Sequence, residues 1–89
     1  MKEMEITAAT PERTIYCGNA KEIFVRTTCG DVKLLPGHAD FMAEIGCGQL
    51  HILSEGKTIT ASTSSGILYT RKNCVSMLLF EPYEVHSRG

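Results

Sequence analysis

The sequence has no long apolar run, no excess of charge of one sign and no excess of polar residues. Its longest apolar segment is Met77–Phe80, whereas a membrane-spanning helix needs about 20 residues. Nine basic and ten acidic residues give a net charge of −1, which argues against a nucleic-acid binder that acts through bulk positive charge. A hydrophobic fraction of 43% argues against disorder. Met1–Glu5 lacks the apolar core of a signal peptide. We therefore expect one cytosolic domain over residues 1–89, without membrane insertion.

Closely spaced cysteine pairs are also missing. The four cysteines, Cys17, Cys29, Cys47 and Cys74, are separated by 12, 18 and 27 positions. Zinc sites and thiol redox sites use pairs only a few residues apart, and a disulfide framework is typical of secreted proteins. We therefore expect these cysteines to be small buried apolar residues, and we predict no metal site and no cofactor.

The common catalytic motifs do not occur either. No serine stands in a Gly-x-Ser-x-Gly elbow, and the chain has neither a phosphate-binding glycine loop nor a His-Glu-x-x-His motif. The histidines His38, His51 and His86 could each approach a cysteine in space, but no spacing favours such a pair. The sequence predicts no catalytic residue.

Turn signals are frequent and evenly distributed. They recur about every 7 to 12 residues, the spacing of an all-β sandwich or barrel. They include Cys29-Gly30-Asp31, Pro36-Gly37, Gly46-Cys47-Gly48, Ser65-Gly66 and Arg71-Lys72-Asn73. Helices of ordinary length have little room between them, so we predict about eight to ten short strands in two packed antiparallel sheets.

Between the turns, apolar residues alternate with polar ones, as in strands that bury one face. The alternating apolar positions are Met4, Ile6 and Ala8, then Leu50 and Ile52, then Ile59 and Ala61, and finally Val75, Met77 and Leu79. We predict that these side chains form the core. Residues 39–45 are ambiguous, because Phe41, Met42 and Ile45 fit a helical turn as well as a strand.

Two segments, Ile23–Val25 and Met77–Phe80, carry apolar residues at consecutive positions. Large side chains then point to both faces of the sheet. Either the domain covers such a strand on both sides, or the second face meets a partner. The sequence leaves both readings open.

One stretch is more specific: a Gly30-Asp31 turn, a short apolar strand, and then Leu35–Ala39, which reads Leu-Pro-Gly-His-Ala. These features resemble the N-terminal β-sandwich of the epsilon subunit of bacterial F-type ATP synthases. Ile6–Glu12, Gly48–Ile52 and Ser65–Tyr69 match further parts of the family pattern. The resemblance is collinear over roughly residues 4 to 85.

Two features depart from the family pattern. Lys33 stands where the family usually has a second glycine, which leaves the conformation of the preceding turn open. Most bacterial members also continue into a C-terminal helical hairpin, whereas only nine residues follow Phe80 here. The predicted fold is a single antiparallel β-sandwich that lacks this hairpin, and we expect the 89-residue chain not to inhibit ATP hydrolysis.

The resemblance implies a non-catalytic subunit of the central stalk, which couples translocation of protons or sodium ions to ATP synthesis and hydrolysis. Its implied partners are the gamma subunit and the c-ring, at the cytoplasmic face of the bacterial cell membrane. The implied c-ring contacts are Gly30, Asp31 and Val32. The implied gamma contacts are His38, Ala39, Phe41, Met42 and Ala43.

Without the resemblance, Asp31 reads as an ordinary turn aspartate and His38 as a polar residue beside a turn. The alternative function is a small stand-alone β-barrel enzyme or ligand-binding module. It would need a deep pocket with convergent polar groups or a cysteine or histidine with a perturbed pKa.

Overall fold

Alternating apolar residues and tight turns fold the chain into strands throughout the part that the structure describes. This computed structural model describes residues 3–88, with side chains through residue 86. The nine strands in this range are β1 (Met4–Ala9), β2 (Thr14–Ala20), β3 (Glu22–Thr27), β4 (Gly30–Leu34), β5 (Phe41–Ser54), β6 (Lys57–Thr63), β7 (Ser65–Arg71), β8 (Cys74–Phe80) and β9 (Glu84–Arg88). No helix occurs between residues 3 and 88. The predicted all-β fold is confirmed.

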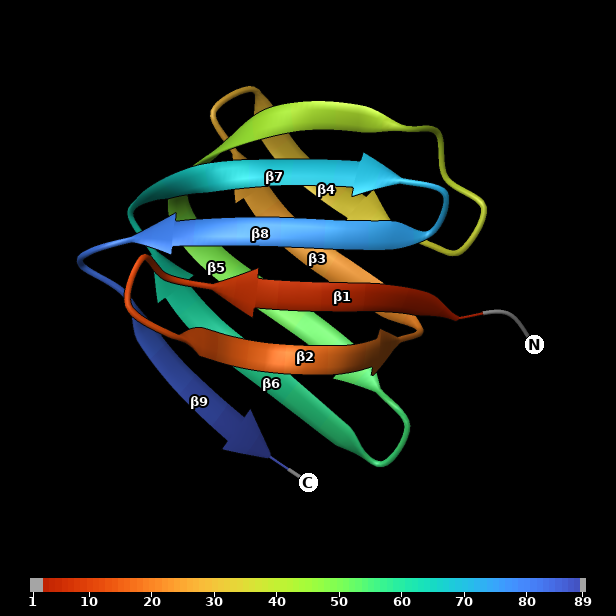
Figure 1. The fold of residues 1–89 in the computed structure, drawn as a ribbon. Coiled ribbons are helices and arrows are strands. Elements are labelled where there is room, and N and C mark those ends of the chain that lie inside the picture. Colours follow the sequence, from red (N-terminus) through yellow and green to blue (C-terminus); the bar gives the residue numbers. More distant parts are fainter. Residues whose placement is uncertain (1–2, 89) are drawn as a thin grey trace.

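The strands form two layers (Figure 1). Strands β7, β8, β1 and β2 lie in front together with the first part of β5, and β4, β3, the rest of β5, β6 and β9 lie behind them. Hydrogen bonding is continuous between the layers, because β5 pairs with β7 through Phe41–Ile45 and with β6 through Gly48–Ser54. The sandwich is therefore one curled sheet rather than the two separate sheets that the sequence predicts.

The prediction of a wholly antiparallel arrangement is wrong at one pair of strands. Strand β1 pairs with β8 in parallel, with Glu5 opposite Cys74 and Ala9 opposite Leu78. Parallel neighbours need a long connection, which β2 to β7 supply here. The sequence could not reveal this pairing, because alternation fixes which face of a strand is buried but not the direction of its neighbour.

Strand β5 bends where the sequence predicts a turn. Gly46-Cys47-Gly48 does not reverse the chain; instead, the register with β3 shifts, so that Val25 pairs with Leu50 but Thr27 with Ile45. A Cβ on Gly46 would lie 3.2 Å from the backbone oxygen of Thr27. This close approach lets β5 continue from one layer into the other. The ambiguous segment 39–45 contains the start of this strand and forms no helix.

The predicted core is confirmed. All ten alternating residues named for it are buried, and they form one cluster with Ile23, Val25, Ile45, Leu34 and Leu68. Burying a large aliphatic side chain contributes about 1.5–3 kcal/mol, so this cluster is the main source of stability.

The two doubly apolar segments bury only one of their faces. Ile23 and Val25 point into the core, which leaves Phe24 half-buried on the outer face of the back layer. Met77 and Leu79 are likewise buried, while Leu78 is half-buried and Phe80 is exposed on the outer face of the front layer. No other described strand covers either outer face. The two segments therefore cannot form one patch.

The first prediction concerns Gly66, where β7 packs closely against β8. A Cβ on Gly66 would clash with the backbone oxygen of Leu78, and this oxygen cannot move aside as the end of a flexible side chain can. We expect Gly66→Ala to lower the free energy of unfolding by about 1–3 kcal/mol, measured by urea denaturation. Ser65→Ala, at the exposed neighbouring position, is the control and should change stability little. Equal stability of the two variants would contradict the packing described for Gly66.

Candidate protein-interaction site

A tight turn precedes β5 and contains one of the predicted contact residues. The His38 amide donates to the Leu35 carbonyl oxygen at 3.1 Å, and Gly37 has a φ of 90°, as a type II turn requires. The His38 ring also donates from Nδ1 to the same oxygen, at 2.9 Å, since a carbonyl can only accept. Its Nε2 is buried without a partner, and the ring packs edge-on against Phe41. His38 therefore braces the turn from within.

This turn is fastened to the hairpin that joins β7 and β8. The Asn73 side-chain oxygen accepts from the Gly37 amide at 2.7 Å, and the Asp40 carboxylate accepts from the Lys72 amide at 2.9 Å. Lys72 and Asn73 have positive φ angles of 49° and 60°, as in a type I′ hairpin turn. These bonds fix the point at which the chain enters β5.

From this entry point, β5 presents alternate residues to solvent. Met42 is 67% exposed, whereas Phe41 is partly buried against the core. Ala39 is exposed in the preceding loop, and Ala43 is half-buried. Of the five predicted gamma contacts, Met42 thus offers the largest free apolar side chain.

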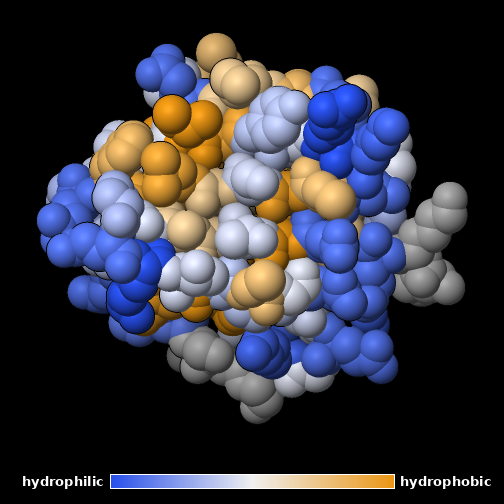
Figure 2. Space-filling view, in the orientation of Figure 1, coloured by the Kyte–Doolittle hydropathy of each residue, from blue (hydrophilic) through white to orange (hydrophobic). Residues whose placement is uncertain are grey.

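Met42 is part of a larger apolar surface. It pairs with Tyr69 on β7, and Ile67 pairs with Leu78 on β8. Ile67 is 42% exposed and Tyr69 is 41% exposed. We define the outer apolar patch as Met42, Ile67, Tyr69, Leu78 and Phe80. In Figure 2, hydrophobic surface gathers at the upper left of this face, and hydrophilic residues line its right edge.

A groove of about 470 Å³ connects this patch to the β3–β4 hairpin. It is lined by Thr27, Thr28 and Cys29 from the hairpin, by Met42, Ala43 and Glu44 from β5, and by Ile67 from β7. Backbone hydrogen bonding holds the two sides together, because the Thr28 amide donates to the Glu44 carbonyl oxygen at 3.0 Å. Of the predicted contact residues, Met42 and Ala43 line this groove, whereas Gly30, Asp31 and Val32 do not; they follow directly after Thr27–Cys29 along the chain.

The β3–β4 hairpin is ordered by its own side chains. The Thr27 hydroxyl donates to the Gly30 carbonyl oxygen at 2.7 Å and accepts from the Cys29 amide at 3.1 Å. Gly30 has a φ of 124°, which favours glycine. Of the predicted c-ring contacts, Gly30 and Asp31 are exposed at this tip, whereas Val32 packs against the core.

Asp31 has a partner within the chain. Arg26 lies opposite it on β3 and contacts both carboxylate oxygens, Nε with Oδ1 and Nη2 with Oδ2. The hydrogen bond and the charge of Asp31 raise the pKa of Arg26. Lys33, at the departure from the family pattern, points to the same outer face and pairs with Glu22 at 2.8 Å.

Sequence reasoning missed several residues of this site. Ile67 and Tyr69 flank the buried Leu68, so Ile67–Tyr69 is another run of consecutive apolar residues. The rule that selected Ile23–Val25 would have found it. Arg26 could have been found by counting outward from the two-residue turn at Thr28–Cys29, which places it opposite Asp31.

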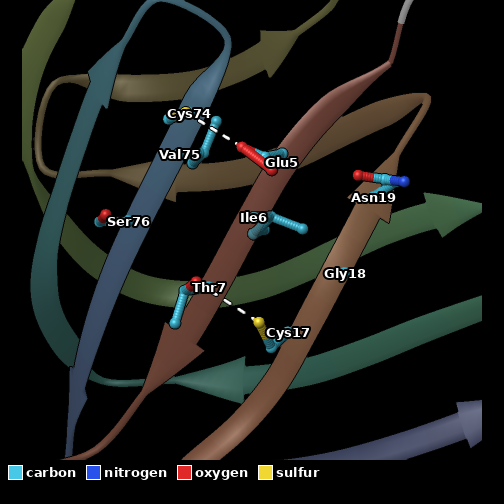
Figure 3. Close-up of a pocket in the computed structure, with 9 residues that line it drawn as sticks. All are labelled: Glu5, Ile6, Thr7, Cys17, Gly18, Asn19, Cys74, Val75 and Ser76. Atoms are coloured by element: carbon cyan, nitrogen blue, oxygen red, sulfur yellow. Dashed lines mark hydrogen bonds between the residues drawn. The ribbon is translucent and has the colours of Figure 1, made fainter.

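A second, shallow pocket of about 230 Å³ lies on the outer face of the front layer (Figure 3). Its thiols belong to Cys74, which donates to the Glu5 carboxylate at 3.4 Å, and to Cys17, which lies 3.8 Å from the Thr7 hydroxyl. All four cysteines of the chain are exposed, so the prediction of buried cysteines is wrong. Cys17, Cys47 and Cys74 occupy outward-facing positions of their strands, and Cys29 lies in the turn of the β3–β4 hairpin. Whether a strand residue is buried depends on which face of the sheet it points to, and not on its residue type.

The chemistry of this pocket differs from that of a thiol enzyme. Catalytic thiols have a lowered pKa, whereas the hydrogen bond to Glu5 raises the pKa of Cys74. None of the residues that line the pocket is a histidine. Across the described residues, no group of three or more His, Cys, Asp or Glu side chains could hold a metal ion, and no helix has the length and apolar character to cross a bilayer.

The fold and these surfaces define an all-β sandwich domain with open grooves and an exposed apolar face. The chain belongs to the family of the β-sandwich domain of the ATP synthase Delta/Epsilon chain, whose model matches residues 3–81. This match confirms the resemblance read from the sequence.

Similar proteins include two bacterial ATP synthase epsilon chains. The protein from Bacillus velezensis is 31% identical over 78 residues, covering 88% of this chain and 59% of its own length. The protein from Desulforudis audaxviator is 35% identical over 74 residues, covering 83% and 54%. The chain thus spans little more than half the length of these relatives.

Solved structures share the fold. A chain in the Euglena gracilis mitochondrial ATP synthase, an OSCP/F1/c-ring assembly, superposes with a TM-score of 0.81 at 19% identity, over 96% of this chain and 53% of that one. A chain in the central stalk/c-ring structure of the Tetrahymena thermophila enzyme gives 0.74 at 16% identity, over 93% and 66%. At these identities the likeness confirms the sandwich fold.

The second prediction concerns the hydrogen bond between Cys74 and Glu5. Because the bond favours the protonated thiol, Glu5→Gln should lower the pKa of Cys74 and shift the pH midpoint of its alkylation by iodoacetamide downward. The bond stabilises the fold below the ordinary thiol pKa, and this contribution is lost as pH rises through the raised pKa. Peptide mass spectrometry measures the rate at each cysteine, with Cys17 as the internal control. An unchanged pH midpoint for the alkylation of Cys74 would show that the hydrogen bond to Glu5 does not favour the protonated thiol.

Proposed function

We propose that this domain is a non-catalytic part of the central stalk of an ATP synthase, at the cytoplasmic face of the bacterial membrane. The outer apolar patch binds the gamma subunit, and the β3–β4 hairpin contacts the c-ring. This arrangement helps to couple ion translocation to ATP synthesis and hydrolysis. The observation that carries the proposal is the continuous surface formed by the patch, the groove and the hairpin.

The patch suits a protein partner better than a small molecule. Its side chains project from neighbouring strands of a sheet and enclose no cavity, whereas small-molecule sites are concave. Clustered apolar side chains beside polar ones mark protein interfaces. Because the chain belongs to this family, we propose the gamma subunit as the partner. The shallow pocket at Cys74 gives no support to the alternative function, a small β-barrel enzyme.

Residues next to the patch give the contact its orientation. The turn at His38 is fixed to the β7–β8 hairpin, so Met42 enters the interface from a rigid support. Predicted gamma contacts that face inward, such as Phe41, act by holding the strand in place. Ala43 lines the groove, where it leaves room for a partner side chain.

The third prediction tests this surface. Met42→Asp and Ile67→Asp should each weaken binding to an ATP synthase head that contains gamma and is depleted of its own epsilon subunit. We expect a loss of about tenfold or more, because a charge replaces apolar area that the partner would cover. Leu53→Asp is the matched control: Leu53 is 36% exposed but lies on the opposite outer face. It should bind like the unaltered chain.

Hydrogen exchange locates the contact independently. Binding to the same head should slow amide exchange in β7 and β8 and leave β6 and β9 unchanged. Equal weakening by all three aspartate variants, or protection confined to the back layer, would contradict the assignment of the patch to gamma.

A further inference from the structure

The exposed carboxylate at the tip of the β3–β4 hairpin is already engaged. Arg26 on β3 pairs with Asp31 on β4, and only the pair Thr27–Gly30 lies between them and the turn. The guanidinium group of Arg26 contacts both carboxylate oxygens of Asp31. Their side chains are 49% and 48% exposed. The pair is therefore accessible to a partner while it is held together within the chain.

The space for Arg26 is built into β5. A Cβ on Gly48 would lie 2.8 Å from the Cβ of Arg26 and 2.9 Å from its Cγ. Gly48 is not among the glycines with positive φ, so the close approach of Arg26, not backbone conformation, requires a glycine here. The register shift between Val25 and Thr27 places this glycine beneath the arginine. The stem of Arg26 is thus fixed by Gly48 and its head by Asp31.

This arrangement changes what the hairpin offers to a partner. A lone carboxylate would select a lysine or arginine, whereas the pair has no net charge. An arginine has five N–H donors and a carboxylate about four acceptor positions, and two of each are used here. The remaining groups donate and accept side by side, as do the backbone groups of a polar loop.

We propose that Arg26 is a contact residue of the c-ring interface and that the Arg26–Asp31 pair binds as a unit, offering its remaining N–H donors and carboxylate acceptors to a polar loop of the ring. The inference rests on the proposed function, because it specifies the chemistry of one contact assigned there. It predicts that removing the arginine weakens the contact, although the removal frees a negative charge.

The fourth prediction compares two forms of ATP synthase, both depleted of their own epsilon subunit: the complete enzyme and its soluble head, which contains gamma but no ring. We expect the Arg26→Ala variant to bind the complete enzyme about fivefold to tenfold more weakly than the unaltered chain does. Its affinity for the soluble head should be unchanged. Arg26→Lys should recover part of the loss, because it retains the charge but not the fork. Gly48→Ala should weaken binding without altering any charge.

Each outcome decides between defined alternatives. If Arg26→Ala binds the complete enzyme equally well or more tightly, Asp31 meets a cation by itself and the inference is wrong. An equal loss for both forms would show that Arg26 only supports the fold, which thermal unfolding checks. If the unaltered chain binds both forms with equal affinity, the hairpin does not contact the ring and the inference falls with that contact. If it binds neither form, the proposed function is wrong as a whole.

Discussion

Strand β5 can serve both layers because its backbone closely approaches β3 at two glycines. A Cβ on Gly46 would press against the Thr27 backbone, and one on Gly48 against the Arg26 side chain. The Thr63 hydroxyl donates to the Gly46 carbonyl oxygen at 2.8 Å, which satisfies a polar group at the bend. Without this bend, β5 could not pair with β7 at one end and β6 at the other, and the single sheet could not curl over its own core.

The same bend links the architecture to the interaction surface. Residues before it carry the exposed Met42, and the strand that it approaches leads directly into the β3–β4 hairpin. The groove between them is therefore set by backbone packing rather than by flexible side chains. In the proposed role between the gamma subunit and the c-ring, such rigidity would be an advantage, because a compliant contact would store torque as deformation.

Alternation and turn spacing predicted the all-β fold and the core correctly, since both follow from local chemistry. The glycines of Gly46-Cys47-Gly48 misled the prediction, because glycine permits both a chain reversal and a close strand approach. For the site, the motif around Asp31 identified the hairpin, but not the arginine opposite it. The solvent exposure of the cysteines was also missed, because a residue type with a strong tendency to be buried occupied outward positions.

The parallel pairing of β1 with β8 has a consequence for how the chain folds during synthesis. Glu5 and Cys74 are 69 positions apart, so β1 lacks its neighbour on one edge until β8 is made. The β3–β4 hairpin needs only local contacts and can form early, whereas Met4 and Ile6 stay exposed until late. Distant pairings of this kind slow folding. The nascent chain therefore completes its core only after β8, which ends with the buried Leu79 and the exposed Phe80, has left the ribosome.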